Sequence, residues 1–222
     1  MSTDHTPLLE AARNGNADDV RRFLPLCDPK HNHSEALCAA AENGHAECVA
    51  LLIPLSDPKS QGYHPLRLAC MNNHIECVRL FLQSTPNDDK SLALHECVKH
   101  QHLECLELLI PFCALHAHNG LPLRTAAREG YTQGVRLLIP LTDLKARTRA
   151  LVESTSAGHV DCMEVLYPVS DPLEALQRIQ DIYPQATKRW QALERMIAQE
   201  QNHTLCAAVG NGSGHKGSAR KM

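Results

Sequence analysis

The sequence is poor in aromatic residues, has no excess of charge of one sign and contains no long apolar run. Phe, Trp and Tyr make up 4% of the 222 residues, against 43% for hydrophobic residues in general. This composition suits close-packed helices filled by Leu, Ala, Val and Cys. The formal net charge of -3 argues against nucleic acid as a partner, because binding phosphates needs a concentrated positive field.

No segment has the pattern of a membrane span or a secretory signal. A span needs about 18 or more consecutive apolar residues, and no stretch approaches that length. The first residues, Met1–His5, lack both the basic and the apolar region of a signal peptide. We therefore expect a cytoplasmic protein without a membrane partner, while export by a route that needs no such signal stays open.

Metal-ligand spacing is missing, and so are the common catalytic motifs. None of the ten cysteines forms a C-x-x-C pair, and no nucleophile elbow, phosphate-binding glycine loop or H-E-x-x-H motif occurs. His-x-x-Cys does recur, but a site needed for function would not be spread over four equal copies. We expect no catalytic residue, metal or cofactor. The glycine-histidine step found among these copies resembles a turn of a known repeat family, and this resemblance implies that the histidine supports the loop. The four pairs are His45/Cys48, His74/Cys77, His102/Cys105 and His159/Cys162.

Three ladders of residues recur at one set of spacings and define an internal repeat. Successive steps of 29, 29, 28, 29 and 28 residues separate the members of each ladder. The ladders are Leu8, Leu37, Leu66, Leu94, Leu123 and Leu151; Gly15, Gly44, Asn73, Gln101, Gly130 and Gly158; and Pro25, Pro54, Gln83, Pro111, Pro140 and Pro168. In the second unit, apolar residues at helical spacing stand on both sides of Gly44, so each unit reads as two helices joined at a tight turn. Equivalent cysteines of neighbouring units would lie about 8–10 Å apart, too far for disulfides.

The repeat resembles that of the ankyrin family. Thr6–Gly15 reads TPLLEAARNG, which is similar to the ankyrin motif TPLHxAAxxGH, and Leu37–His45 and Leu123–Gly130 match it as well. The ending LIPLSDP of Leu52–Pro58 is similar to ankyrin-like arrays of bacterial proteins. The resemblance implies an all-α, helical-hairpin solenoid that binds a partner protein through residues of the first helices and the adjoining loops.

The units depart from the family in length. Ankyrin units have about 33 residues, and the shortfall here falls where ankyrins form a projecting β-hairpin. We therefore predict short loops, a shallower groove and almost no strand. The predicted array spans residues 1–172, with repeats near 6–33, 34–61, 62–90, 91–118, 119–146 and 147–172.

A helical cap is predicted after the array, because a repeat array exposes an apolar end unless an atypical element covers it. Asp171-Pro172 has the pattern of an N-cap followed by proline at the first helical position. Capping helices are expected over residues 173–207, and the glycine-rich residues 208–222 are expected to form a disordered tail. The apolar residues assigned to the covering faces are Leu173, Leu176, Ile179 and Ile182, then Ala186, Trp190, Leu193 and Ile197.

The candidate binding residues form a basic-leaning strip on the middle units, for which a partner with an acidic patch would be suited. The leading hypothesis is a non-catalytic, monomeric adaptor or an inhibitor of the immunity type. The alternatives are an exported bacterial effector that engages a host protein, and an enzyme with a site built on the groove. The strip consists of Tyr63, Arg67, Met71, His95, Lys99, His100, Arg124 and Arg128.

Overall fold

The computed structural model describes residues 5–84, 90–113, 120–182 and 190–212. All regular structure in these ranges is helical. This confirms the predicted all-α class and the expectation of almost no strand.

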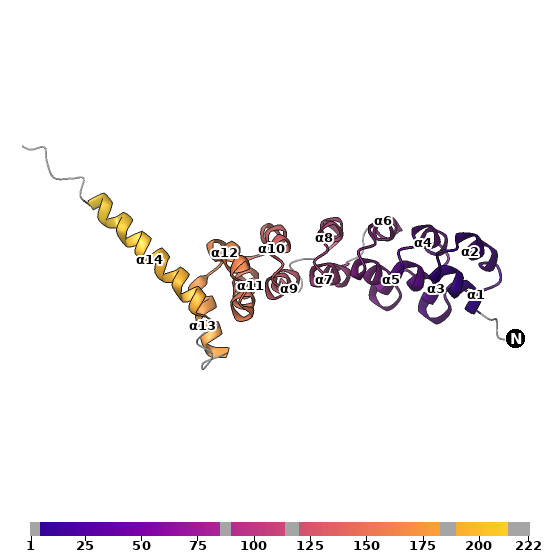
Figure 1. The fold of residues 1–222 in the computed structure, drawn as a ribbon, viewed down its shortest axis with the longest axis horizontal. Coiled ribbons are helices and arrows are strands. Elements are labelled where there is room, and N and C mark those ends of the chain that lie inside the picture. The colour runs from indigo at the N-terminus through magenta and orange to yellow at the C-terminus, as the bar shows by residue number, and fades with distance from the viewer. Residues whose placement is uncertain (1–4, 85–89, 114–119, 183–189, 213–222) are drawn as a thin grey trace, which may run out of the picture.

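Six pairs of antiparallel helices stack side by side, with the first helices in one row and the second helices in another (Figure 1). The first helices are α1 (Thr6–Arg13), α3 (His31–Glu42), α5 (Ser60–Met71), α7 (Ser91–Lys99), α9 (Leu121–Arg128) and α11 (Leu144–Ala157). The second helices are α2 (Ala17–Phe23), α4 (Ala46–Leu52), α6 (Ile75–Ser84), α8 (Leu103–Leu109), α10 (Thr132–Leu138) and α12 (Val160–Leu166). Helix α11 begins three residues before the predicted unit boundary at 147. The first turns of α3 and α5 contain left-handed residues, so the regular part of each of these two helices begins later than its first residue.

The short second helices end next to the proline ladder. In units 4, 5 and 6 the proline lies inside a single 3-10 turn that follows the helix: η1 (Ile110–Phe112), η2 (Ile139–Leu141) and η3 (Tyr167–Val169). Proline lacks the amide hydrogen that a further helical turn would need. The predicted end of the second helix is therefore confirmed in these units.

All six members of the glycine ladder adopt the left-handed conformation that joins the paired helices. Their φ angles run from 59° at Asn73 to 84° at Gly158. The turn thus has the same conformation whether or not the residue is glycine. The units differ only in the steric strain that a side chain adds to a left-handed residue.

The recurring histidines connect each unit to the one before it. The Nε2 atoms of His45, His74 and His102 lie 3.0, 2.9 and 3.1 Å from main-chain carbonyl oxygens of the preceding unit. A carbonyl oxygen only accepts, so Nε2 carries the hydrogen in each case. The rings therefore serve the loop, as the sequence predicts. Among the described residues no group of three His, Cys, Asp or Glu side chains is arranged to hold a metal ion.

One continuous apolar core runs through the array. Every leucine of the first ladder is at most 1% exposed, and the cysteines Cys48, Cys77, Cys105 and Cys162 are equally buried. Nine of the ten cysteines, those from Cys27 to Cys162, are free thiols. Burial raises the pKa of Cys38 and Cys77 to about 11, so these thiols are protonated at neutral pH and are poor nucleophiles.

A second repeated contact ties the loops together where ankyrins carry their hairpins. The main-chain N–H groups of Asp28, Asp57 and Asp171 each donate a hydrogen bond to a side chain 23 residues earlier. Each acceptor residue lies three residues before the ladder leucine of its first helix. The acceptors are His5 Nδ1, Ser34 Oγ and Thr148 Oγ1, at distances of 3.1, 2.9 and 3.1 Å. This clamp was not predicted from the sequence.

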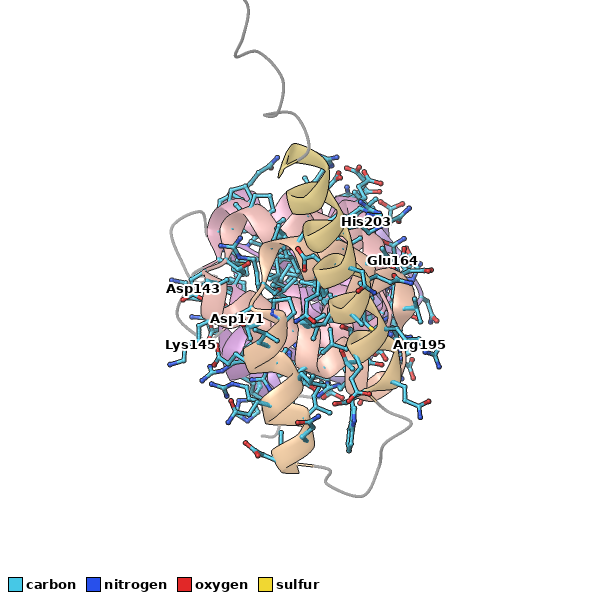
Figure 2. The ribbon with its side chains drawn as sticks, turned by 90° about the vertical axis from the view of Figure 1, so that its left-hand side faces the viewer. Asp143, Lys145, Glu164, Asp171, Arg195 and His203 are labelled. Atoms are coloured by element: carbon cyan, nitrogen blue, oxygen red, sulfur yellow. The ribbon has the colours of Figure 1, made fainter. Side chains whose placement is uncertain are left out.

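Helices α13 (Pro172–Ile182) and α14 (Gln191–Gly212) follow the array at its C-terminal end, and α14 leads away from the stacked units (Figure 1). Figure 2 views the molecule from this end, with α13 and α14 in front. Asp171 Oδ1 accepts from the main-chain N–H of Glu174 at 3.0 Å, which is the predicted N-cap. Trp190, Leu193 and Ile197 are buried. The atypical terminal helices therefore pack their apolar side chains against the last unit, as a cap does.

Two residues assigned to the covering face of α13 are exposed instead: Leu173 at 63% and Ile182 at 59%. Leu173 precedes Ala175 by two residues, which turn a helix by about 200°, so Leu173 lies away from the buried side. Ile182 is on the side of Ala175 but is the last residue of α13. The buried side of α13 carries Ala175 and Ile179.

The end of the cap also differs from the expected boundary. Helix α14 continues to Gly212, five residues past the predicted end at 207. The rest of the expected tail, 213–222, lies outside the described residues, as does Ala186.

Replacing Gly44 by alanine should destabilise the protein more than the same change at Gly158. Both glycines are left-handed, with φ of 77° and 84°, so alanine costs about 1–2 kcal/mol of backbone strain at either position. At Gly44 the new Cβ would also lie 2.5 Å from Nδ1 of the His74 ring, whereas nothing lies within 4 Å at Gly158. Urea unfolding of both variants measures the difference, and equal losses would mean that the ring moves aside freely.

Candidate protein-binding surface

One stripe of exposed or partly exposed side chains runs along each of the middle first helices, on the side away from the core. Its positions lie two residues before, one residue after and five residues after the ladder leucine, so they recur at helical spacing. We call these stripes together the first-helix face. On the middle units it consists of His64, Arg67 and Met71 on α5; Leu92, His95 and Lys99 on α7; and Leu121, Arg124 and Arg128 on α9.

Arg67 and Arg124 each form an ion pair with the next unit. Arg67 Nη2 lies 2.8 Å from Glu96 Oε1, and Arg124 Nη2 lies 2.5 Å from Glu153 Oε1. Both arginine side chains are 33% exposed. These two candidates thus bind a carboxylate of their own chain and hold neighbouring first helices together. These ion pairs were not predicted from the sequence, which placed both arginines in the candidate binding strip.

His95 occupies the equivalent position between these two arginines, but no ion pair forms there. The residue that would supply the carboxylate, by analogy with Glu96 and Glu153, is Thr125. His95 Nδ1 and Thr125 Oγ1 are both shielded from solvent and have no hydrogen-bond partner in the described part of the chain. The junction between units 4 and 5 therefore lacks the cross-unit ion pair of its neighbours.

Burial is the largest effect and lowers the pKa of His95. The negative charge of Glu96 opposes this, and the smaller effects of the positive charges of Arg128, Lys99 and Arg67 lower the pKa further. The ring is therefore largely neutral at pH 7.

A row of unsatisfied polar atoms crosses three consecutive units. Besides His95 Nδ1, the Nε atoms of Arg67 and Arg124 are shielded from solvent and have no hydrogen-bond partner among the described residues. An unpaired buried donor costs about 1–3 kcal/mol. The chain itself therefore leaves hydrogen-bonding capacity unused at the same position of α5, α7 and α9.

Lys99 and Arg128 are exposed cations of this surface. They occupy the same position on α7 and α9, at the end of each stripe. Arg128 makes one contact, 3.3 Å from its Nε to the carboxylate of the adjacent, exposed Glu129. Such a contact contributes little to stability and leaves the guanidinium accessible.

The remaining candidates lie at three different places. Met71 is half-buried on the stripe of α5. His100 follows the end of α7, where its ring stacks on His102 with 6.0 Å between centroids. Tyr63 does not lie on the first-helix face. It occupies the clamp position three residues before Leu66, and Lys90 Nζ lies 5.5 Å from the centre of its ring.

Two leucines of the first-helix face were missed. Leu92 is 58% exposed and Leu121 is 41% exposed, and they occupy the same position on neighbouring helices. The signal was available in the sequence, because in the other units this position is polar: Thr6, Glu35, His64 and Arg149.

Comparisons with known proteins agree with this architecture. Residues 8–91 match the family model of ankyrin repeats in three copies. The crystal structure of the human ASB11 ankyrin repeat domain superimposes with a TM-score of 0.62 at 23% sequence identity, covering 73% of this chain and 83% of that domain. No curated protein matches the chain.

Residues 8–91 of the chain are thus similar to the ankyrin-repeat family, and the described helices have the fold of an ankyrin-repeat solenoid. Ankyrin arrays are in general protein-binding modules, and the fold is typically a non-catalytic scaffold. None of the described helices is both long and apolar enough to cross a membrane.

Proposed function

We propose that the protein is a non-catalytic adaptor or inhibitor that holds an acidic surface of another protein on the first-helix face of α5, α7 and α9. The observation that carries the proposal is the row of unsatisfied atoms on Arg67, His95 and Arg124. A partner carboxylate that approaches this row would be met by the Nε–H donors of Arg67 and Arg124, which the chain does not use itself, once a small rotation of these side chains presents them.

Charge supports an acidic partner. Lys99 and Arg128 stand exposed beside the row, while the carboxylates of Glu96 and Glu153 are already paired with Arg67 and Arg124. Opposite charge on a partner would both steer the encounter and fix its register.

Reversing the two exposed cations, by Lys99→Glu with Arg128→Glu, should weaken partner binding about tenfold or more. These side chains hold no other unit in place, so the melting temperature should stay nearly unchanged. The measurement is affinity capture by the full chain from a lysate of the cells that make it, followed by titration of the captured protein.

The matched control is Arg22→Glu with Arg136→Glu, which reverses two exposed cations on the second helices α2 and α10. It should leave binding intact. A partner that both variants retain would contradict the proposal, as would the absence of any partner that distinguishes them. Charge reversal at Arg67 or Arg124 is less informative, because it would also break an internal ion pair.

A further inference from the structure

We propose that the first-helix face receives an acidic, amphipathic helix of the partner, laid along the array across α7 and α9. Its apolar side chains would contact Leu92 and Leu121, and its carboxylates would contact Lys99 and Arg128. The inference rests on the proposed function and adds the shape and the side-chain pattern of the bound segment.

The apolar side of this site is the pair Leu92 and Leu121. Both are exposed, although the same position is polar in all four other units. They fall on two adjacent helices, so they form one row rather than two isolated contacts. The core does not need them, because Leu94 and Leu123 already fill the buried face of these helices.

The charged side is the pair Lys99 and Arg128, at the other end of the same two stripes. Seven residues separate Leu92 from Lys99, and likewise Leu121 from Arg128. This corresponds to about 10.5 Å along a helix at 1.5 Å per residue. A helix with its side chains is about 10–12 Å wide. One helix lying between the two rows would therefore touch leucines on one flank and cations on the other.

The spacing of the units favours a helix over an extended strand. Neighbouring packed helices lie about 8–10 Å apart. Side chains on one face of a strand recur every 6.4–6.8 Å, so neither one step nor two fits this distance. On a helix, residues i and i+7 lie on one side and about 10.5 Å apart, which is within about 0.5 Å of this range and nearer to it than either strand step. A partner helix can thus keep the same contact from α7 to α9 by repeating its pattern every seven residues.

The floor between the two rows is polar and unsatisfied. It contains His95 Nδ1 and Arg124 Nε, neither of which has a hydrogen-bond partner among the described residues. Acceptor side chains on the lower side of the partner helix, such as Glu or Gln, would suit these positions. Apolar, acceptor and acidic residues would then follow one another around the partner helix.

The test uses the full chain and the partner captured as described above. Replacing Leu92 and Leu121 together by serine should weaken binding about tenfold or more. The control pair is Leu26→Ser with Leu55→Ser, because these leucines are 67% and 48% exposed at a matched position of units 1 and 2. The control pair should bind like the unchanged protein.

Cross-linking then identifies the bound segment. A photoreactive benzoyl-phenylalanine at position 92, and separately at position 121, should attach to two sites seven residues apart in one acidic segment of the partner. Attachment to sites three residues apart would indicate an extended chain and overturn the inference. Attachment to a basic segment, or to a second copy of this chain, would overturn it as well.

The two proposals fail in different ways. If Lys99→Glu with Arg128→Glu leaves binding intact, the proposed function is wrong, and the inference falls with it. Suppose instead that Lys99→Glu with Arg128→Glu abolishes binding, while Leu92→Ser with Leu121→Ser binds as well as the control variant Leu26→Ser with Leu55→Ser. The proposed binding surface is then supported, and the inference of an amphipathic helix is wrong.

Discussion

Leu94→Ala should lower the free energy of unfolding by about 2–5 kcal/mol, the usual cost of truncating a fully buried leucine. Leu94 is 0% exposed at the centre of α7. The surrounding leucines come from neighbouring units that are held by their own contacts, so the cavity cannot collapse completely. Denaturant unfolding followed by circular dichroism measures the loss.

The same substitution should also split the unfolding transition. Each unit contacts only its neighbours, so a weakened unit 4 uncouples the two ends of the array. The junction between units 4 and 5 favours such a split, because two contacts found at other junctions are missing from it. Tyr131 replaces the histidine that connects other units, and His95 forms no ion pair with unit 5.

Leu92→Ala provides the matched control, since it removes the same atoms from the exposed side of the same helix. Its effect should stay within about 0.5 kcal/mol. A single cooperative transition with little loss for Leu94→Ala would contradict the repeat assignment of unit 4.

Gly134→Cys should destabilise the protein by about 1–3 kcal/mol, although removing a glycine from a helix ordinarily stabilises it. An added Cβ at Gly134 would lie 2.3 Å from Cδ1 of the Tyr131 ring. Tyr131 is only 5% exposed and has packed neighbours, so the ring has little room to move.

Tyr131→His should rescue this variant. Units 2, 3, 4 and 6 combine histidine with cysteine at these two positions, whereas unit 5 combines tyrosine with glycine. The larger ring thus occupies the space that the cysteine side chain fills elsewhere. Tyr131→His alone leaves that space empty and should also cost stability.

A double-mutant cycle on the two positions should therefore give a coupling energy of about 1–3 kcal/mol, with the double variant more stable than the sum of the single changes predicts. Thermal and urea unfolding of the four proteins measure it. Additive losses would show that the tyrosine and the glycine changed independently.

Much of the fold follows from spacing alone. The leucine, glycine and proline ladders place the core, the left-handed turns and the ends of the second helices, and each ladder is confirmed in the described units. Prediction from spacing succeeds because a repeat array needs the same few contacts in every unit. The residues that make these contacts therefore recur in each of the six units. Where the pattern occurs once, the prediction was weaker: on α13 a row with three-residue steps was taken for one face, and Leu173 and Ile182 proved exposed.

The candidate surface was only partly predictable. Helical spacing places Arg67, His95 and Arg124 at one position of three first helices, and the same spacing would have found Leu92 and Leu121. It does not predict that Arg67 pairs with Glu96 and Arg124 with Glu153, or that Tyr63 faces Lys90. These contacts join residues of different units, and their distances depend on how far one unit is shifted against the next.

The sequence by itself therefore determined which side of each helix is buried, how many units stack and where each turn lies, because helical periodicity acts within a unit of 28 or 29 residues. Only the tertiary structure decided which surface charges are already used by the chain and which remain for a partner. That distinction depends on the stacking of neighbouring units, which brings Glu96 and Glu153 within reach of two arginines and leaves His95 opposite a threonine.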